Sequence, residues 1–178
     1  SEMCIRDRVM LGDHERAKAA FVESGELLQE ARRRAPKYEP AITGEIRLYL
    51  DMARYARTRA RGREVLDCLT AADNALSQVS QLNTLKRDRG LTHRICLDSV
   101  DVMEHYMMIG EAGTVRDRLP GIIQLTDEAI ANQTARLDLY VLRVRLLALS
   151  GQVFAKLNDP ERQLAQLAEA EMLIGGVL

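Results

Sequence analysis

The fold is decided most clearly by residues 146–168, which read LLALSGQVFAKLNDPERQLAQLA. On both sides of Asn158, apolar residues recur every three or four positions, which is the spacing of amphipathic helices. Between the two runs, Asn158 predicts a turn, Asp159 is a suitable N-cap, and Pro160 fits the first position of a helix, where its missing N–H costs nothing. The stretch therefore predicts two helices joined by a tight turn.

The same periodicity extends over most of the 178 residues. It predicts a helix that starts at the N-cap Asp13 and stops before Pro36, because proline disfavours a helical residue before it. No segment alternates with a period of two and β-branched enrichment, so the chain is predicted to be all-α. The further helices are predicted at about 46–60, 65–79, 91–109, 120–132, 139–153 and 160–173.

Glycine and proline mark the expected breaks between these helices. Residues 36–44, with two prolines and one glycine, are predicted to form a loop. Gly62 is predicted to end one helix, and Gly110 with Gly113 to form a turn. Pro120 is placed in the first turn of the helix that follows, where it lacks no hydrogen bond.

The composition excludes several classes of protein. Apolar residues make up 47% and charged residues 29% of the chain, which is too apolar for a disordered segment. A net charge of −1 argues against binding to nucleic acid or an anionic membrane, and the absence of tryptophan removes a stacking platform for single strands. No run approaches the ~20 apolar residues that span a bilayer, and no secretion signal is visible.

The three cysteines, Cys4, Cys68 and Cys96, are isolated along the chain. Their odd number and irregular spacing do not suggest a disulfide framework. A reducing compartment, the cytoplasm, is the simplest prediction.

Residues 1–8, SEMCIRDR, resemble a translated sequencing adapter. The transposase adapter TCG GAG ATG TGT ATA AGA GAC AG encodes Ser-Glu-Met-Cys-Ile-Arg-Asp, and its last two bases begin an Arg or Ser codon. Segments of this kind are excluded from fold reasoning. The sequence thus predicts one natural domain over residues 9–178, truncated at its N-terminus, with truncation at its C-terminus as a further option. A genuine short N-terminal tail is the alternative for residues 1–8.

The helical pairs are also similar to one another, and they resemble tetratricopeptide repeats. In that family the first helix carries a bulky residue, a Leu-Gly and an aromatic, and the second helix carries small and large apolar residues. In the last pair, Gln163 stands where a small residue is expected. The positions that match there are Leu147, Ser150-Gly151, Phe154, Asn158-Asp159, Leu167 and Ala170.

Two further parts of the chain match this pattern more loosely. Gly12-Asp13, Ala17, Phe21 and Ser24 look like a second helix whose first helix is missing. The residues that resemble another pair are Tyr49, Met52-Ala53, Ala56, Val65, Leu69 and Ala72.

The resemblance implies antiparallel helix pairs stacked as an α-solenoid, with an irregular helical bundle as the alternative. The turns near Gly12, Gly62, Gly113 and Asn158 are 45 to 51 residues apart, which exceeds the ~34 of the standard repeat. The helices are therefore expected to be longer, similar to repeats of bacterial signal-transduction regulators. Because the first natural helix would lack its partner, we expect an apolar patch at the N-terminal end and self-association there.

Catalytic motifs are not found in the sequence: it has no phosphate-binding loop, H-E-x-x-H or nucleophile elbow, and we predict neither an enzyme nor a cofactor. His93 and Cys96 could share a helical face, but two ligands do not make a zinc site, so a surface histidine and a core cysteine are favoured. Residues 32–34, three arginines, are expected to complement a helix dipole. Met103, Met107 and Met108 could line a binding surface, with core packing as the default alternative.

The resemblance also implies a concave groove lined by first helices, which would receive a peptide of a partner protein. Arginine matches carboxylates, so an acidic peptide is the expected ligand, and a merely solvated arginine face is the alternative. The residues predicted to face this groove are Arg47, Arg54, Arg57, Met103, Met107, Arg145, Gln152 and Lys156.

The predicted function is a protein-interaction or sensory module of a larger bacterial protein, such as a transcriptional regulator with its effector domain elsewhere. No direct binding to nucleic acid or membrane is expected. The two alternatives are a helical domain of an enzyme whose catalytic part is missing, and a structural scaffold.

Overall fold

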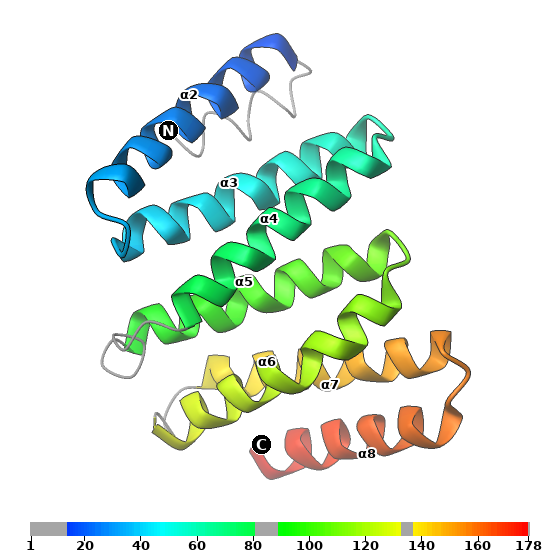
Figure 1. Ribbon diagram of the computed structural model, residues 1–178. Helices are drawn as coiled ribbons and strands as arrows, with labels where there is room; N and C mark the ends of the chain where they lie inside the picture. Colours follow the sequence, from blue (N-terminus) through cyan, green and yellow to red (C-terminus); the bar gives the residue numbers. More distant parts are fainter. Residues whose placement is uncertain (1–13, 81–88, 133–136, 178) are drawn as a thin grey trace. The chain divides into compact units, whose positions relative to one another are not determined.

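The computed structural model describes residues 14–80, 89–132 and 137–177, and these form helices joined by short turns. The prediction of an all-α chain is confirmed for this part of the molecule, and Asp13 and residues 1–8 lie outside it. The helices (Figure 1) are α2 (His14–Arg34), α3 (Glu39–Thr58), α4 (Gly62–Ser80), α5 (Arg89–Met108), α6 (Ala112–Asn132), α7 (Leu137–Lys156) and α8 (Pro160–Val177). None of the described helices combines the length and the apolar character that crossing a membrane requires.

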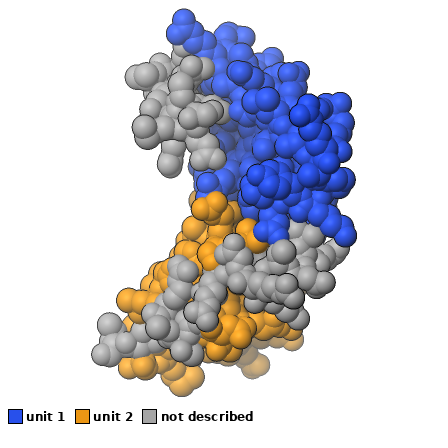
Figure 2. Space-filling model, turned by 90° about the vertical axis from the view of Figure 1, so that its left-hand side faces the viewer, with its two compact units in different colours: residues 1–82 blue, residues 83–178 orange. Residues whose placement is uncertain are grey.

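The chain divides into two compact units, residues 1–82 and 83–178 (Figure 2). In unit 1, α3 packs against both α2 and α4. In unit 2, α7 packs against α5, α6 and α8, and α5 also packs against α6. Within each unit this packing is consistent with the predicted stack of helical pairs.

Each unit has its own apolar core, built from the helical stripes that the sequence displays. In unit 1, Ile42 and Ile46 of α3 and Leu69 of α4 are almost fully buried. In unit 2, Ile95 of α5 and Leu146 of α7 are fully buried. A fully buried side chain of this size contributes about 1.5–3 kcal/mol, so these stripes hold the helices of each unit together.

One turn recurs three times, at the junctions α3–α4, α5–α6 and α7–α8. The residue after the helix C-cap is left-handed in each case: φ is 54° at Ala60, 90° at Gly110 and 56° at Asn158. The following N–H donates to a carbonyl five residues back, which defines a Schellman motif. The three bonds are Arg61 to Ala56 at 3.1 Å, Glu111 to Tyr106 at 3.0 Å, and Asp159 to Phe154 at 2.9 Å.

These three turns recur at nearly equal intervals along the sequence. The left-handed residues follow at intervals of 50 and 48 residues, and the next helix begins two residues after each of them. Leu69, Leu119 and Leu167 then occupy the same place, nine residues after the turn. The described pairs thus share one local design, whose repeat is longer than ~34 residues, as the sequence predicted.

One predicted break is displaced and another is confirmed in part. Gly62 does not end a helix but is the first residue of α4, and the chain turns at Ala60 instead, where φ is positive. Gly110 forms a turn with positive φ, as predicted, whereas Gly113 lies inside α6. At Asn158 the prediction is confirmed, and Asp159 caps α8 by accepting the Arg162 N–H at 3.2 Å.

Two predictions that rested on proline need correction, whereas α2 ends at Arg34, before Pro36, and α8 begins at Pro160, as predicted. The predicted loop over residues 36–44 is shorter, because α3 begins at Glu39 and Pro40 occupies the first turn, where a helix tolerates proline. Pro120 is not in a first turn but inside α6, which begins eight residues earlier. Pro120 has no N–H to donate to the carbonyl of Arg116. Because Pro120 is exposed, this missing hydrogen bond does not lie in the core.

Helices α7 and α8 lie close together at Gly151 of α7. A Cβ atom there would stand 3.3 Å from Cδ2 of Leu167 in α8 and 3.8 Å from the carbonyl oxygen of Gln163. The glycine that resembles the Leu-Gly of the repeat pattern is therefore at a position with little room for a side chain.

Candidate functional site

Unit 1 has a groove along α3, between α2 and α4, which we call the α3 groove. Its volume is about 530 Å³, within the usual range of ligand sites. The floor consists of α3 residues spaced three or four apart, so that they share one face of the helix. The floor is formed by Glu45, Leu48, Tyr49, Met52, Tyr55, Ala56 and Arg59. The walls are Glu15, Lys18, Phe21, Val22, Gly25, Glu26 and Gln29 of α2, with Arg61, Glu64 and Cys68 at α4.

The middle of the groove is apolar. Phe21 and Val22 from α2 meet Leu48 and Met52 from α3 along its length. Met52 and Leu48 are only partly buried and pack against the Ala17–Phe21 core cluster of α2. Val22 is 56% exposed, so apolar surface remains available to a ligand.

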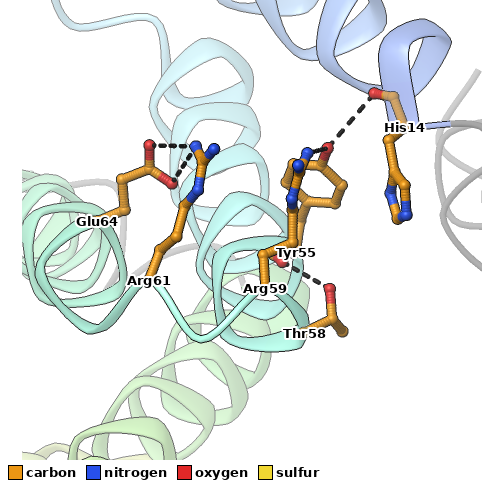
Figure 3. A network of polar contacts seen from close by, with 6 residues as sticks. All are labelled: His14, Tyr55, Thr58, Arg59, Arg61 and Glu64. Carbon is orange, nitrogen blue, oxygen red and sulfur yellow. Dashed lines mark hydrogen bonds and ion pairs between the residues drawn. The ribbon is translucent and has the colours of Figure 1, made fainter.

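One end of the groove is organised around Tyr55 (Figure 3). Its hydroxyl donates to the backbone carbonyl of His14 at 3.4 Å and accepts from Nη1 of Arg59 at 2.9 Å. The Tyr55 ring lies 5.7 Å from that of Phe21, between centroids. Beside it, Nη1 of Arg61 donates to the Glu64 carboxylate at 3.0 Å. This network holds the Arg59 guanidinium at the rim.

The opposite end of the groove is acidic. Glu26 and Glu45 lie there, and Oε2 of Glu45 accepts from Nη1 of Arg32 at 2.8 Å. Burial raises the pKa of Glu45, and the Arg32 charge acts in the opposite direction. Nη2 of Arg32 also donates to Oε1 of Gln78 at 2.6 Å, so a single arginine links α2, α3 and α4 at this end.

Two weakly acidic groups of the groove, the Tyr49 phenol and the Cys68 thiol, have raised pKa values and are therefore neutral at pH 7. Burial raises the pKa of the Tyr49 phenol, with a further contribution from the Glu45 charge. Burial also raises the pKa of the Cys68 thiol, and Glu64 and Asp67 add to the effect. A thiol with a raised pKa is a poor nucleophile, so Cys68 contributes apolar surface rather than reactivity.

Unit 2 contains the equivalent groove along α7, between α6 and α8, with a volume of about 650 Å³. Relative to the left-handed turn residue, Arg143 corresponds to Glu45 and Ser150 to Met52. Arg143 donates to Asp127 of α6 at 2.7 Å and to Glu169 of α8 at 2.8 Å. Its side chain, which is 12% exposed, thus ties the two walls together across the floor. At the position of Arg143 the α3 groove has Glu45, which pairs with Arg32 of α2 at 2.8 Å, and at that of Ser150 it has the apolar Met52.

The arginines predicted to bind a peptide lie on another face of the first helices. Arg47 and Arg145 are equivalent positions, thirteen residues before their turns, and neither lines a groove described above. Arg145 pairs with Glu104 at 2.8 Å and with Asp101 at 3.2 Å, both in α5. Arg54 pairs with Asp51 at 2.8 Å. These two guanidinium groups already have carboxylate partners within the chain.

The remaining predicted groove residues divide into core and surface. Met103 is fully buried and Met107 is 6% exposed, so both have the core role that was the alternative for methionine. Arg57, Gln152 and Lys156 are exposed. The α3 groove contains none of the eight predicted residues. The sequence signal for it is the spacing of Tyr49, Met52, Tyr55 and Arg59, which share one face of a helix.

The histidine and cysteine weighed above as metal ligands, His93 and Cys96, have structural roles. Nε2 of His93 lies 3.0 Å from Oδ2 of Asp138, and Cys96 is buried. Burial raises the pKa of Cys96 to about 11. Among the residues described, no cluster of three or more His, Cys, Asp or Glu side chains could hold a metal ion. Met108 is 60% exposed.

The arginines of residues 32–34 are at the C-terminus of α2, as predicted. Arg33 and Arg34 pair with Glu30 one turn earlier, at 3.0 and 2.7 Å.

Comparison with protein families and curated proteins finds no significant match to this chain. No model of a protein family matches the chain, and no curated protein matches it significantly. The likeness to tetratricopeptide repeats therefore stays a resemblance of motifs.

Proposed function

We propose that the chain is a protein-interaction module that binds a segment of a partner protein in the α3 groove. The observation that supports this proposal is the composition of that groove. It combines a partly exposed apolar middle with charged groups at both ends. Binding sites for peptides commonly have this form, with apolar anchors for affinity and polar groups at the rim.

This proposal changes the location of the site but not the kind of function predicted. The arginines of the first helices were expected to bind an acidic peptide, and Arg54 and Arg145 have carboxylate partners in the chain. A role within a larger bacterial regulator rests on the resemblance alone.

A pair of valine variants tests the proposal. Peptides selected from a displayed random library on the whole chain should bind at least tenfold more weakly to V22E, because a carboxylate at this position replaces apolar surface in the groove. Val22 is 56% exposed, so the fold should tolerate the change. The measurement is the Kd of each selected peptide by fluorescence anisotropy.

V141E is the matched control. Val141 is 53% exposed on α7 and lines neither groove, so the same substitution should leave the Kd unchanged. Selected peptides that bind V22E as tightly as the unchanged chain would refute the α3 groove as the site.

A further inference from the structure

We infer that the ligand of the α3 groove is an amphipathic helix with acidic residues at one end and basic residues at the other. This inference rests on the proposed function and specifies the chemistry of the partner. It follows from three properties of the groove: the direction of its helices, the distribution of charge along it, and the state of its backbone groups.

The direction of the helices fixes which charges share an end. The start of α2 lies beside the end of α3, because Tyr55 bonds to the carbonyl of His14. The end of α2 lies beside the start of α3, because Arg32 bonds to Glu45. The groove residues of α2 and α3 can therefore be ordered along one axis, with Tyr55 at one end and Glu45 at the other.

The charges at these two ends differ. At the Tyr55 end, Lys18 and Arg59 line the groove together with Glu15, and the charge of Arg61 is compensated by Glu64 at 3.0 Å. We call this the basic end (Figure 3). The network around Tyr55 holds Arg59 in place, so its charge is pre-positioned for a ligand.

The Glu45 end has the opposite character. Glu26, Gln29 and Glu45 line it, and no basic residue does. Arg32, which pairs with Glu45, approaches from outside the lining and is itself shared with Gln78. We call this the acidic end. A ligand that complements both ends must carry acidic groups over Arg59 and Lys18, and a basic group over Glu26, because the Glu45 carboxylate is already paired with Arg32.

The walls decide the conformation of the ligand. Three helices form the groove, and the backbone groups in the middle of a helix are already paired within it. A ligand strand would find no backbone partners there, whereas a helix satisfies its own N–H and C=O groups. From Glu45 to Arg59 the floor extends roughly 21 Å at 1.5 Å per residue, which matches a helix of about 14 residues.

Three synthetic peptides test the inference on the whole chain. They have the same apolar central stripe and about 14 residues, and differ only at their ends: acidic and basic, both acidic, or both basic. The first should bind about fivefold more tightly than either of the others, the order expected for two partly exposed charge pairs. This preference should disappear at ~1 M salt, where charges are screened within about 3 Å.

Charge reversal at the basic end provides the matching variant. R59E should weaken the acidic–basic peptide about fivefold and make the peptide with two basic ends the tightest ligand. R63E is the control, because Arg63 is exposed on α4 outside the groove and the change in net charge is the same. R63E should leave the order of the three peptides unchanged.

The outcomes separate this inference from the function on which it rests. If V22E abolishes binding of all three peptides but their affinities lie within a factor of about two, the groove is the site and the inference on charge is wrong. A response to R63E equal to that to R59E also overturns the inference. If no peptide binds, or V22E changes nothing, the proposed function and the inference fail together.

Discussion

At the scale of single residues, the three Schellman turns show one conformation with three different side chains. Ala60, Gly110 and Asn158 are all left-handed, with φ between 54° and 90°. Glycine adopts this conformation freely and asparagine tolerates it, whereas alanine is penalised by its Cβ. Ala60, at the end of α3, is therefore the strained member of the set.

Replacing Ala60 with glycine should stabilise the chain. The left-handed penalty of alanine, roughly 1–2 kcal/mol, is partly offset by the greater entropy of glycine in the unfolded state. We expect A60G to raise the free energy of unfolding by about 0.5–1 kcal/mol, measured by urea denaturation followed by circular dichroism.

The reverse substitution at the equivalent turn is the control. G110A should lower the free energy of unfolding by a similar amount, because the same backbone conformation is then imposed on alanine at φ 90°. If A60G and G110A change stability in the same direction, the left-handed turn is not the cause.

At the scale of the helical element, α5 places a thiol in the core of unit 2. Cys96 is fully buried, and burial raises its pKa from 9.0 to about 11, with Thr126 acting in the opposite direction. The folded state therefore favours the neutral thiol more strongly than the unfolded state does. This contribution to stability is fully present below about pH 9 and is lost as the pH rises to about 11.

Alkaline denaturation should reveal this thiol. Between pH 8 and pH 11 we expect the free energy of unfolding to fall by about 2–3 kcal/mol more in the unchanged chain than in C96A, since one pKa unit corresponds to about 1.4 kcal/mol. Tyr49 and Cys68, whose pKa values are also raised, are present in both proteins and cancel in the comparison. Parallel pH profiles for the two proteins would contradict the prediction.

The helical elements also show where pattern reading succeeds and fails. Apolar periodicity located the described helices, because the spacing of the apolar core residues can be read from the sequence. Helix boundaries depended on proline and glycine, and these failed at Pro120 and Gly113, which α6 incorporates. A proline signals a missing hydrogen bond, but packing of a long helix can outweigh that loss.

At the scale of the whole molecule, the exposed apolar residues concentrate on the last helix. The N-terminal patch expected from the sequence corresponds, among the described residues, to Val22 and Leu27 of α2, which are 56% and 67% exposed. On α8 four large apolar side chains are exposed. These residues are Leu164, Leu167, Met172 and Ile174, with exposures of 67%, 43%, 73% and 45%.

We expect the isolated chain to self-associate with rising concentration, mainly through α8, because exposed apolar side chains promote association. M172K should lower the weight-average mass measured by light scattering at high concentration, because it replaces the most exposed of these apolar side chains with a charge. L27K tests the N-terminal alternative in the same assay. A larger effect of L27K than of M172K would assign the association to α2, and a monodisperse unchanged chain would refute both.

The sequence by itself determined the all-α class and the position of the last turn and its cap. These are local properties, since a stripe of period 3.6 and an Asn-Asp-Pro turn need no distant partner.

Only the tertiary structure decided which face of each first helix is covered and which is open. The face of Arg145 meets Asp101 and Glu104, 44 and 41 residues away in the chain, and the open face of α3 is bounded by α2 and α4. Periodicity tells which residues share a face, but burial of that face depends on helices contributed from elsewhere in the chain. For this reason Arg59 and Tyr55, and not the predicted arginines, lie at the end of the candidate site.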